Sequence, residues 1–315
     1  MIENIDKIIL GNSGIAISPL GIGAWAWGDR SVWGYGQDYG ETDVQEAFEA
    51  SLKAGINFFD TAELYGLGRS ERLLGKFIRE SGAQVIVASK FMPFPWRLSK
   101  ERLANALRNS LQRLGMEQVD LYQIHFPLPP RPVEIWADAL ADAHDQGLVR
   151  AVGVSNYDEE KMRRTQLRLR KRGVPLTSNQ VEYSLLNRRV EFNHLLRACH
   201  DEGITLIAYS PLEQGLLTGK YTPENPPPGA RGREYNRSRL EEIQPLIHLM
   251  REIGHQHEEK TPAQVALNWL ICKGTLPIPG AKNARQAIEN AQALGWRLTQ
   301  EEMDALDEIS ARLSK

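Results

Sequence analysis

The chain has 315 residues, of which 42% are apolar and 25% charged, with a formal net charge of −2 and a pI near 6.4. This composition is typical of a globular protein and excludes a disordered or fibrous chain. The balance of charge argues against nucleic-acid binding, and no apolar run approaches the roughly 20 residues that a membrane-spanning helix needs. The first residues carry no signal or transit pattern, and the two cysteines, Cys199 and Cys272, lie in helical patterns. We therefore expect a cytoplasmic protein without disulfides.

The predicted elements begin with a β-hairpin, in which residues 8–10 and 15–17 flank the turn residues 11–14. Eight strand–helix units follow. The strands are predicted at residues 20–23, 56–59, 85–88, 119–124, 149–154, 178–181, 204–208 and 276–278. The helices are predicted at about 43–54, 70–80, 99–114, 133–146, 158–172, 189–201, 236–256, 283–294 and 299–312. The proline-rich segment 223–232 is expected to be a surface loop, and the helix after it an insertion.

The alternation of strands and helices decides between fold classes. Strands separated by helices pair in parallel through right-handed crossovers. Eight such units, with no linker between two halves, favour a closed barrel over an open doubly wound sheet. We predict an α/β fold: a single (β/α)8 TIM-barrel domain over residues 1–315, with an N-terminal β-hairpin and extra C-terminal helices.

One polar residue stands at the end of each of six successive strands. These residues are Asp60, Lys90, His125, Ser155, Gln180 and Tyr209, at intervals of 30, 35, 30, 25 and 29 residues. One charged residue at the end of a strand carries little information, because the chain is leaving the core there. In a barrel, however, the carboxyl ends of all strands open on one face, so six in register predict a site at that face.

Asp60 and Lys90 carry the most information. Each follows an apolar strand closely enough to be partly buried, and a buried charge needs a partner. A structural ion pair would satisfy both, but Tyr65 lies only five residues beyond Asp60. An ammonium beside a phenol lowers the phenol pKa from its ordinary value near 10, so Tyr65 is a candidate general acid. His125 would donate a hydrogen bond to the same substrate oxygen, although a lone histidine is more often an ordinary buried group.

Protonation of a carbonyl oxygen must be accompanied by hydride transfer to its carbon, and only a cofactor such as a nicotinamide supplies a hydride. The spacing Gly21-x-Gly23-x-x-Ala26 matches a dinucleotide fingerprint, but an irregular glycine-rich loop follows it instead of a helix, so we reject that match. The segments 209–220 and 279–286 follow strands seven and eight, where barrels bind phosphate. The alternative is that both are ordinary polar loops. Lys282 and Arg285 could hold a 2′-phosphate, which favours NADPH over NADH.

At these residues the sequence resembles the aldo-keto reductase family, from about residue 8 to about 310. The motifs that carry the resemblance lie at residues 60–66, 89–90, 124–125, 153–156, 179–183, 210–212 and 278–280. The resemblance implies a barrel that uses NADPH/NADP+ without a separate dinucleotide-binding domain and without a metal. It implies Tyr65 as the proton donor, Lys90 and Asp60 as the groups that tune it, and His125 as the residue that orients the carbonyl.

The resemblance also implies a set of cofactor-binding residues. Ser155, Asn156 and Gln180 would hold the nicotinamide carboxamide, and Tyr209 would stack on its ring. The full expected set is Ala24, Trp25, Asp60, Ser155, Asn156, Gln180, Tyr209, Ser210, Pro211, Leu212, Gly215, Lys220, Gly280, Lys282, Gln286, Glu289 and Asn290.

The substrate pocket is expected to be aromatic, because several large rings follow strands one, three and four. The expected pocket residues are Trp27, Trp33, Phe91, Trp96 and Phe126. Rings at such positions are more often core, but these lie among glycines and prolines. The expected partner is a small carbonyl substrate, an aromatic or medium aliphatic aldehyde or a ketone.

Two other functions remain open at this point. The sequence also resembles potassium-channel beta subunits, in which the same barrel binds a cofactor and acts as the partner of another protein. A barrel that binds a sugar or phosphate without redox chemistry is the other alternative. The complete set of Asp60, Tyr65, Lys90 and His125 favours an NADP(H)-dependent aldo-keto reductase over both.

Overall fold

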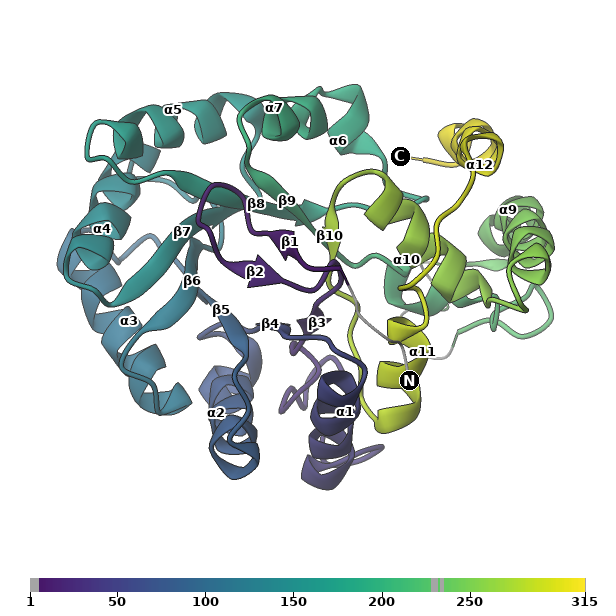
Figure 1. Cartoon of the computed structure of the whole chain (residues 1–315), viewed down its shortest axis with the longest axis horizontal. Helices are drawn as coiled ribbons and strands as arrows, with labels where there is room; N and C mark the ends of the chain where they lie inside the picture. Colours follow the sequence, from purple (N-terminus) through teal and green to yellow (C-terminus); the bar gives the residue numbers. More distant parts are fainter. Residues whose placement is uncertain (1–5, 228–231, 233–234, 315) are drawn as a thin grey trace.

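A computed structural model describes residues 6–227, 232 and 235–314. Its main element is a parallel sheet of eight strands, in which each strand pairs with the next one along the chain (Figure 1). The strands are β3 (Ile22–Gly23), β4 (Phe58–Asp60), β5 (Ile86–Phe91), β6 (Val119–Ile124), β7 (Val149–Ser155), β8 (Leu176–Glu182), β9 (Thr205–Tyr209) and β10 (Leu276–Pro277).

The sheet closes on itself between its first and last strands. The backbone N–H of Gly21 donates to the carbonyl of Pro277, and that of Gly23 to the carbonyl of Pro279, each at 3.0 Å. A Cβ atom on Gly23 would stand 3.0 Å from the carbonyl oxygen of Ile278, so glycine lets the two backbones approach. The predicted (β/α)8 barrel is confirmed.

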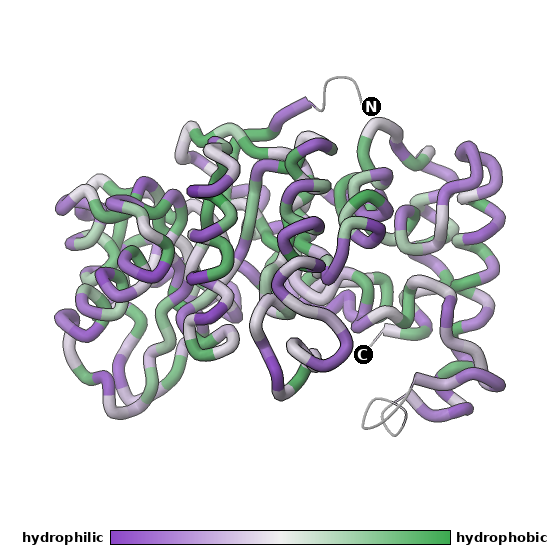
Figure 2. Tube along the Cα trace, turned by 90° about the horizontal axis from the view of Figure 1, so that it is seen from below, coloured by the Kyte–Doolittle hydropathy of each residue, from purple (hydrophilic) through white to green (hydrophobic). Residues whose placement is uncertain are grey.

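Helices cover the outside of the barrel (Figure 1). They are α1 (Glu41–Lys53), α2 (Arg69–Ser81), α3 (Lys100–Leu114), α4 (Val133–Asp145), α5 (Glu159–Arg170), α6 (Arg189–Phe192), α7 (Leu195–Asp201), α9 (Arg237–Gln256), α10 (Pro262–Cys272), α11 (Ala284–Ala291) and α12 (Gln300–Ala311). Two short 3-10 helices, η1 (Tyr65–Gly68) and η2 (Glu213–Thr218), lie in the loops after β4 and β9. Along the helices hydrophobic and hydrophilic residues alternate (Figure 2), as expected for helices that pack one face on a core.

The structure differs from the prediction at two helices, and part of one predicted loop lies outside the described residues. The predicted helix at 189–201 is divided into α6 and α7, because His194 adopts a left-handed conformation with φ of 62°. Helix α10 was not predicted, although Thr261 and Gln264 form a capping box at its start. Of the predicted loop at 223–232, residues 228–231 lie outside the described residues.

The N-terminal hairpin closes one end of the barrel. Strands β1 (Ile8–Ile9) and β2 (Ala16–Ile17) pair antiparallel, as predicted, and lie across the sheet in Figure 1. Leu10, Ile15 and Ile17 of this hairpin are buried against residues from the interior of the barrel, including Phe58 and Leu121. The amino ends of the strands are therefore covered by apolar side chains of the hairpin.

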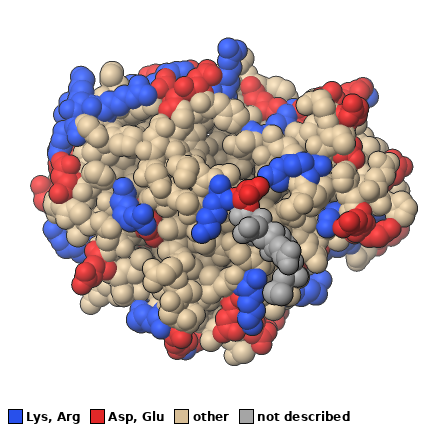
Figure 3. All heavy atoms as spheres, in the orientation of Figure 1, with Lys and Arg blue, Asp and Glu red and all other residues tan. Residues whose placement is uncertain are grey.

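Charged side chains of both signs are mixed over the face drawn in Figure 3. Ion pairs also join α4 and α5, where Arg164 pairs with Glu134 and Arg168 with Asp138 at 2.8 and 2.7 Å. Helix α5 thus has a charged outer face whose side chains form ion pairs with α4. Within the described ranges, no helix has both the length and the hydropathy that crossing a bilayer requires.

Candidate active site

A cavity of about 750 Å³ opens at the carboxyl ends of the strands. Three of the four residues predicted to be catalytic, Asp60, Tyr65 and His125, line it, and Lys90 lies directly behind them. The strands position these groups: Asp60 is the last residue of β4, Lys90 lies in β5, and His125 follows β6. Because neighbouring parallel strands end at one level, residues 30 to 35 positions apart in sequence become neighbours in space.

The ammonium of Lys90 is the centre of this group. Its Nζ donates to Oδ2 of Asp60 at 2.5 Å, to the carbonyl of Thr61 at 2.9 Å and to Oη of Tyr65 at 3.2 Å. These contacts use all three protons of the ammonium. The side chains of Lys90 and Asp60 are 0% and 2% exposed, so the pair is shielded from water and its mutual attraction is strong.

The local backbone brings Tyr65 over this pair. Tyr65 begins η1, in which Gly66 and Leu67 adopt left-handed conformations with φ of 55° and 56°. The turn carries the phenol ring back over Lys90, whose Nζ lies 4.8 Å from the ring centroid. Trp25 stacks on the same ring at 6.0 Å, and the imidazole of His125 meets its edge at 5.8 Å.

The pKa of Tyr65 differs from the sequence-based expectation. Burial raises the pKa of its phenol above 10, and the charge of Lys90 lowers it by less than burial raises it. The expectation of a net lowered pKa is therefore wrong, because the sequence does not show how much the packing around the ring opposes the charged phenolate. The hydroxyl stays protonated at neutral pH, which is the form that a proton donor requires. Although burial opposes the charge of Lys90, Asp60 raises the Lys90 pKa above its ordinary value.

His125 is neutral in this environment. Burial and the nearby charge of Lys90 lower the pKa of its imidazole to about 3. Its backbone N–H donates to the carbonyl of Phe91 at 2.8 Å, which fixes the residue at the end of β6. Its buried Nδ1 has no hydrogen-bond partner in the described part of the chain. A neutral imidazole beside Tyr65 can donate one hydrogen bond and carries no charge that would repel Lys90.

Polar side chains from β7, β8 and β9 form the next part of the cavity. Ser155 Oγ donates to the carbonyl of Gln180 at 2.8 Å, and Tyr209 Oη donates to Oδ1 of Asn156 at 2.9 Å. Gln180 Nε2 donates to Oδ1 of Asp60 at 2.8 Å. These contacts link the residues predicted to hold a carboxamide directly to the residues predicted to be catalytic.

Three cationic side chains also line the cavity. Lys220 lines it from the loop after β9 and Arg285 from the first turn of α11, and the side chain of Arg285 is 80% exposed. Lys282 also lines it, but its Nζ donates to the carbonyl of Trp33 at 3.1 Å and lies over the ring of Tyr39 at 4.6 Å. In this structure Lys282 therefore joins the loop after β10 to the loop after β3.

Comparison with known proteins decides the family. Residues 19–311 match the family model described as the Aldo/keto reductase family. The chain belongs to this family. It is 45% identical to a chloroplastic pyridoxal reductase of Arabidopsis thaliana, over 93% of this chain and 83% of that one. It is 30% identical to an NADH-specific methylglyoxal reductase of Escherichia coli, over 98% of this chain and 99% of that one.

A solved structure gives the same result. A thermostable aldo-keto reductase in complex with the inhibitor epalrestat superposes with a TM-score of 0.78 at 32% identity, over 96% of this chain and 99% of that one. As an aldo-keto reductase, the protein is an oxidoreductase that reduces carbonyl compounds with a nicotinamide cofactor.

The lining of the cavity in this aldo-keto reductase contains every residue predicted for cofactor binding except Ala24. Ala24 is buried, and its carbonyl accepts a hydrogen bond from Ser70 Oγ at 2.8 Å. The lining also contains residues that the sequence reasoning missed. Those missed are Gly23, Ala26, Leu64, Gln214, Thr218, Tyr221, Ala263, Ile278 and Pro279. Leu64 could have been found, because it directly precedes Tyr65 in a motif that the sequence analysis had already selected.

Three of the predicted substrate-pocket residues lie elsewhere, so those assignments are corrected. Trp27 is fully buried, and its Nε1 donates to the carbonyl of Ala281 at 2.8 Å. Phe91 is fully buried and packs on Trp136 at 5.1 Å between ring centroids. Trp96 is 69% exposed, outside the lining. The remaining two, Trp33 and Phe126, line the cavity.

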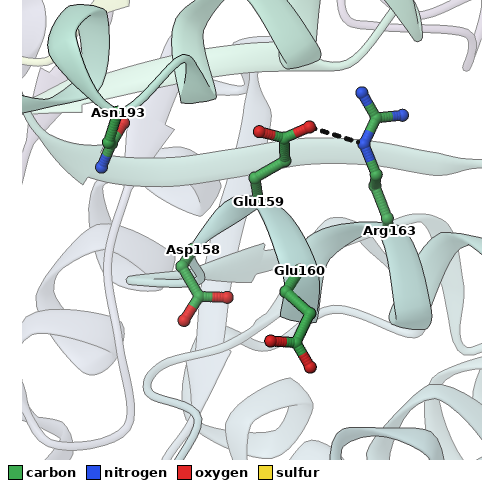
Figure 4. Close-up of a pocket in the computed structure, with 5 residues that line it drawn as sticks. All are labelled: Asp158, Glu159, Glu160, Arg163 and Asn193. Atoms are coloured by element: carbon green, nitrogen blue, oxygen red, sulfur yellow. Dashed lines mark hydrogen bonds and ion pairs between the residues drawn. The ribbon is translucent and has the colours of Figure 1, made fainter.

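A second hollow lies on the outer surface, at the start of α5. It is lined by Asp158, Glu159, Glu160, Arg163 and Asn193 (Figure 4). Glu159 pairs with Arg163 at 2.8 Å, and Asp158 caps the helix by accepting from the N–H of Lys161. These contacts account for the charges as parts of a helix start, and no residue of the catalytic group lines this hollow.

Proposed function

We propose that this aldo-keto reductase reduces aldehydes to alcohols with NADPH, and that Tyr65 donates the proton. The observation that carries the proposal is the contact of Tyr65 Oη with Lys90 Nζ at 3.2 Å, where Lys90 is itself paired with buried Asp60 at 2.5 Å. A structural ion pair alone would not need a phenol aligned on the ammonium at the edge of a cavity.

The residues of the cavity fit a nicotinamide dinucleotide. Its inner end offers the amides and hydroxyls of Ser155, Asn156 and Gln180, which suit a neutral carboxamide. Its outer end offers cations, which suit a pyrophosphate and a 2′-phosphate. When bound, the reduced nicotinamide supplies the hydride that no side chain can provide.

The side chains of this chain perform the remaining chemistry. Tyr65 and His125 are both neutral donors at the reacting end of the cavity, so both can bind the carbonyl oxygen and polarise it. Tyr65 then gives its proton to the developing alkoxide. The phenolate that this leaves lies 3.2 Å from the Lys90 ammonium, which stabilises it in a site shielded from water. Asp60 holds that ammonium in place.

The preference for NADPH rests on Lys282 and Arg285. Arg285 lines the cavity with an exposed guanidinium that lies 3.9 Å from the carboxylate of Glu289, and we propose that it binds the 2′-phosphate. Lys282 would have to leave the carbonyl of Trp33 to do so. The preference is tested by the ratio of NADPH to NADH dissociation constants in wild type, Lys282→Ala and Arg285→Ala. Equal affinity for both cofactors in the wild type would overturn it.

The substrate that fits best is a neutral aromatic aldehyde. Trp25 stacks on Tyr65, Phe126 stacks on His125 and Trp33 packs against Trp25. Lys220, Lys282 and Arg285 lie instead in the segments 209–220 and 279–286 proposed to hold the cofactor. Pyridoxal is the first substrate to test, because a relative with 45% identity is named for its reduction. Pyridoxal 5′-phosphate, which adds a dianion to the same ring, is the matched comparison. A higher kcat/KM for the phosphorylated aldehyde would contradict this choice.

The proposal is tested by following NADPH absorbance with the purified protein and a panel of aldehydes. Wild type should oxidise NADPH, and Tyr65→Phe should bind NADPH but not oxidise it. A wild-type protein that binds NADPH, but does not oxidise it with any aldehyde of the panel, would support the interaction-subunit alternative. A protein that binds no NADPH would support the sugar- or phosphate-binding alternative.

A further inference from the structure

A second ion pair lies beside the catalytic group. Glu63 stands two residues before Tyr65, and its side chain is only 8% exposed. Its Oε1 accepts a hydrogen bond from the backbone N–H of Met92 at 2.7 Å and from Nη1 of Arg97 at 2.5 Å. Its Oε2 accepts from Nη2 of Arg97 at 3.3 Å. The carboxylate therefore has a bidentate arginine partner and a backbone donor.

The guanidinium of Arg97 is fixed on its other sides as well. Its Nη1 also donates to the carbonyl of Met92 at 3.0 Å. The group lies over the rings of Phe91 and Phe94, at 5.0 and 5.5 Å from their centroids. Phe91 is part of the buried core, so Arg97 is anchored to the body of the barrel. An arginine held in this way is less free to move than one in an ordinary surface ion pair.

The pair joins the two chain segments that carry the proton donor and its cation. Glu63 lies between Asp60 and Tyr65, and Met92 lies two residues beyond Lys90. The backbone N–H of Glu63 also faces the carbonyl of Lys90 at 3.4 Å. A displacement of one segment against the other would change the 3.2 Å separation between Tyr65 Oη and Lys90 Nζ.

The turn that follows Tyr65 gives a reason for such a restraint. Leu67 has a left-handed backbone at φ of 56°, and the residue is 84% exposed, so apolar packing does not hold it. A non-glycine residue in this conformation persists only when its surroundings impose it. We propose that Glu63 and Arg97 form a positioning pair that sets the distance between Tyr65 and Lys90. This inference rests on the proposed role of Tyr65 as proton donor.

The test compares Arg97→Met with a matched variant at the opposite end of the barrel. Asp120 is also 8% exposed, accepts from the N–H of Val87 at 2.8 Å and pairs with Arg150 at 2.6 Å. Arg97→Met and Arg150→Met thus each remove an arginine from a shielded carboxylate that keeps a backbone donor. Only the first carboxylate lies beside Tyr65.

For Arg97→Met we expect kcat to fall about 10- to 100-fold, because a displacement of a catalytic group by about 1 Å lowers the reaction rate by a factor of that order. The dissociation constant for NADPH should stay within about threefold, since the pair does not line the cofactor end. The primary deuterium isotope effect on kcat, measured with NADPH that carries deuterium at the transferred position, should rise. The reason is that proton and hydride transfer become slower than product release. Arg97→Lys, which keeps the charge, should recover part of the rate.

Arg150→Met should lose stability with its kcat unchanged. The inference is overturned if Arg97→Met keeps the kcat and the isotope effect of the wild type. It is also overturned if the fall in rate is no larger than the fall in the fraction of folded protein, measured as the amount of NADPH bound. Glu63→Gln, which keeps an acceptor for Met92, provides the same comparison if Arg97→Met does not fold. Failure of the proposed function is distinguishable, because wild type would then be inactive or Tyr65→Phe would be active.

Discussion

Replacing Lys90 with methionine separates the stability of the barrel from its chemistry. The substitution leaves Asp60 without the ammonium that lies 2.5 Å from its Oδ2, while Gln180 still donates to Oδ1 at 2.8 Å. Removing one partner of a buried pair costs about 3–5 kcal/mol, because the remaining charge is uncompensated. We expect the free energy of unfolding of Lys90→Met to fall by about that amount. Adding Asp60→Asn removes the second charge and should restore most of it.

Carbonyl reduction should respond differently. Both the single and the double variant lack the cation that stabilises the Tyr65 phenolate, so both should lose about 10²-fold or more in kcat. Urea unfolding followed by tryptophan fluorescence gives the stability, and NADPH oxidation at saturating aldehyde gives the rate. An unchanged urea midpoint for Lys90→Met would refute the buried pair. Recovery of activity in the double variant would refute the role of Lys90 in the reaction.

Three further outcomes are expected. Tyr65→Phe should lower kcat about 10²–10⁴-fold with unchanged NADPH affinity, measured by fluorescence titration; full activity would remove Tyr65 from the reaction. The pKa of His125 is about 3 when folded and near 6.5 when unfolded, so the unfolded chain binds more protons between these values. Wild-type stability should therefore fall as pH drops from 6.5 to 3, by up to about 1.4 kcal/mol per pH unit more than in His125→Phe; parallel stability curves would contradict this. Arg285→Ala should weaken NADPH more than NADH, and equal weakening by isothermal titration would assign Arg285 to the pyrophosphate.

The sequence predicted the barrel and the position of the catalytic group for one physical reason. Each strand–helix unit has a nearly constant length, and parallel strands end on one face, so Asp60, Lys90 and His125 can be placed together without knowing any contact. The contact of Tyr65 with Lys90 could be predicted because only a short loop separates Tyr65 from Asp60. These features follow from residues close together in the sequence and from the order of strands in the sheet.

The features that the sequence did not predict depend on the direction of a single side chain or on distant segments. Phe91 directly follows Lys90 in β5, and successive strand residues point to opposite faces, so Lys90 faces the interior whereas Phe91 packs on Trp136. Phe91 was assigned to the substrate pocket because it is next to Lys90 in the sequence, but its side chain points to the opposite face of the strand. Lys282 contacts the carbonyl of Trp33, which lies 249 residues away, and no local pattern encodes that meeting.

The seam between residues 21–23 and 277–279 affects when activity can appear during synthesis. Trp25 and Lys282, which face the same cavity, are contributed by opposite ends of the polypeptide. A nascent chain that stops before β10 would hold Asp60, Tyr65, Lys90 and His125 but would leave the edges of β3 and β9 unpaired. The ring therefore closes only after β10, which lies close to the end of the sequence, has been synthesised.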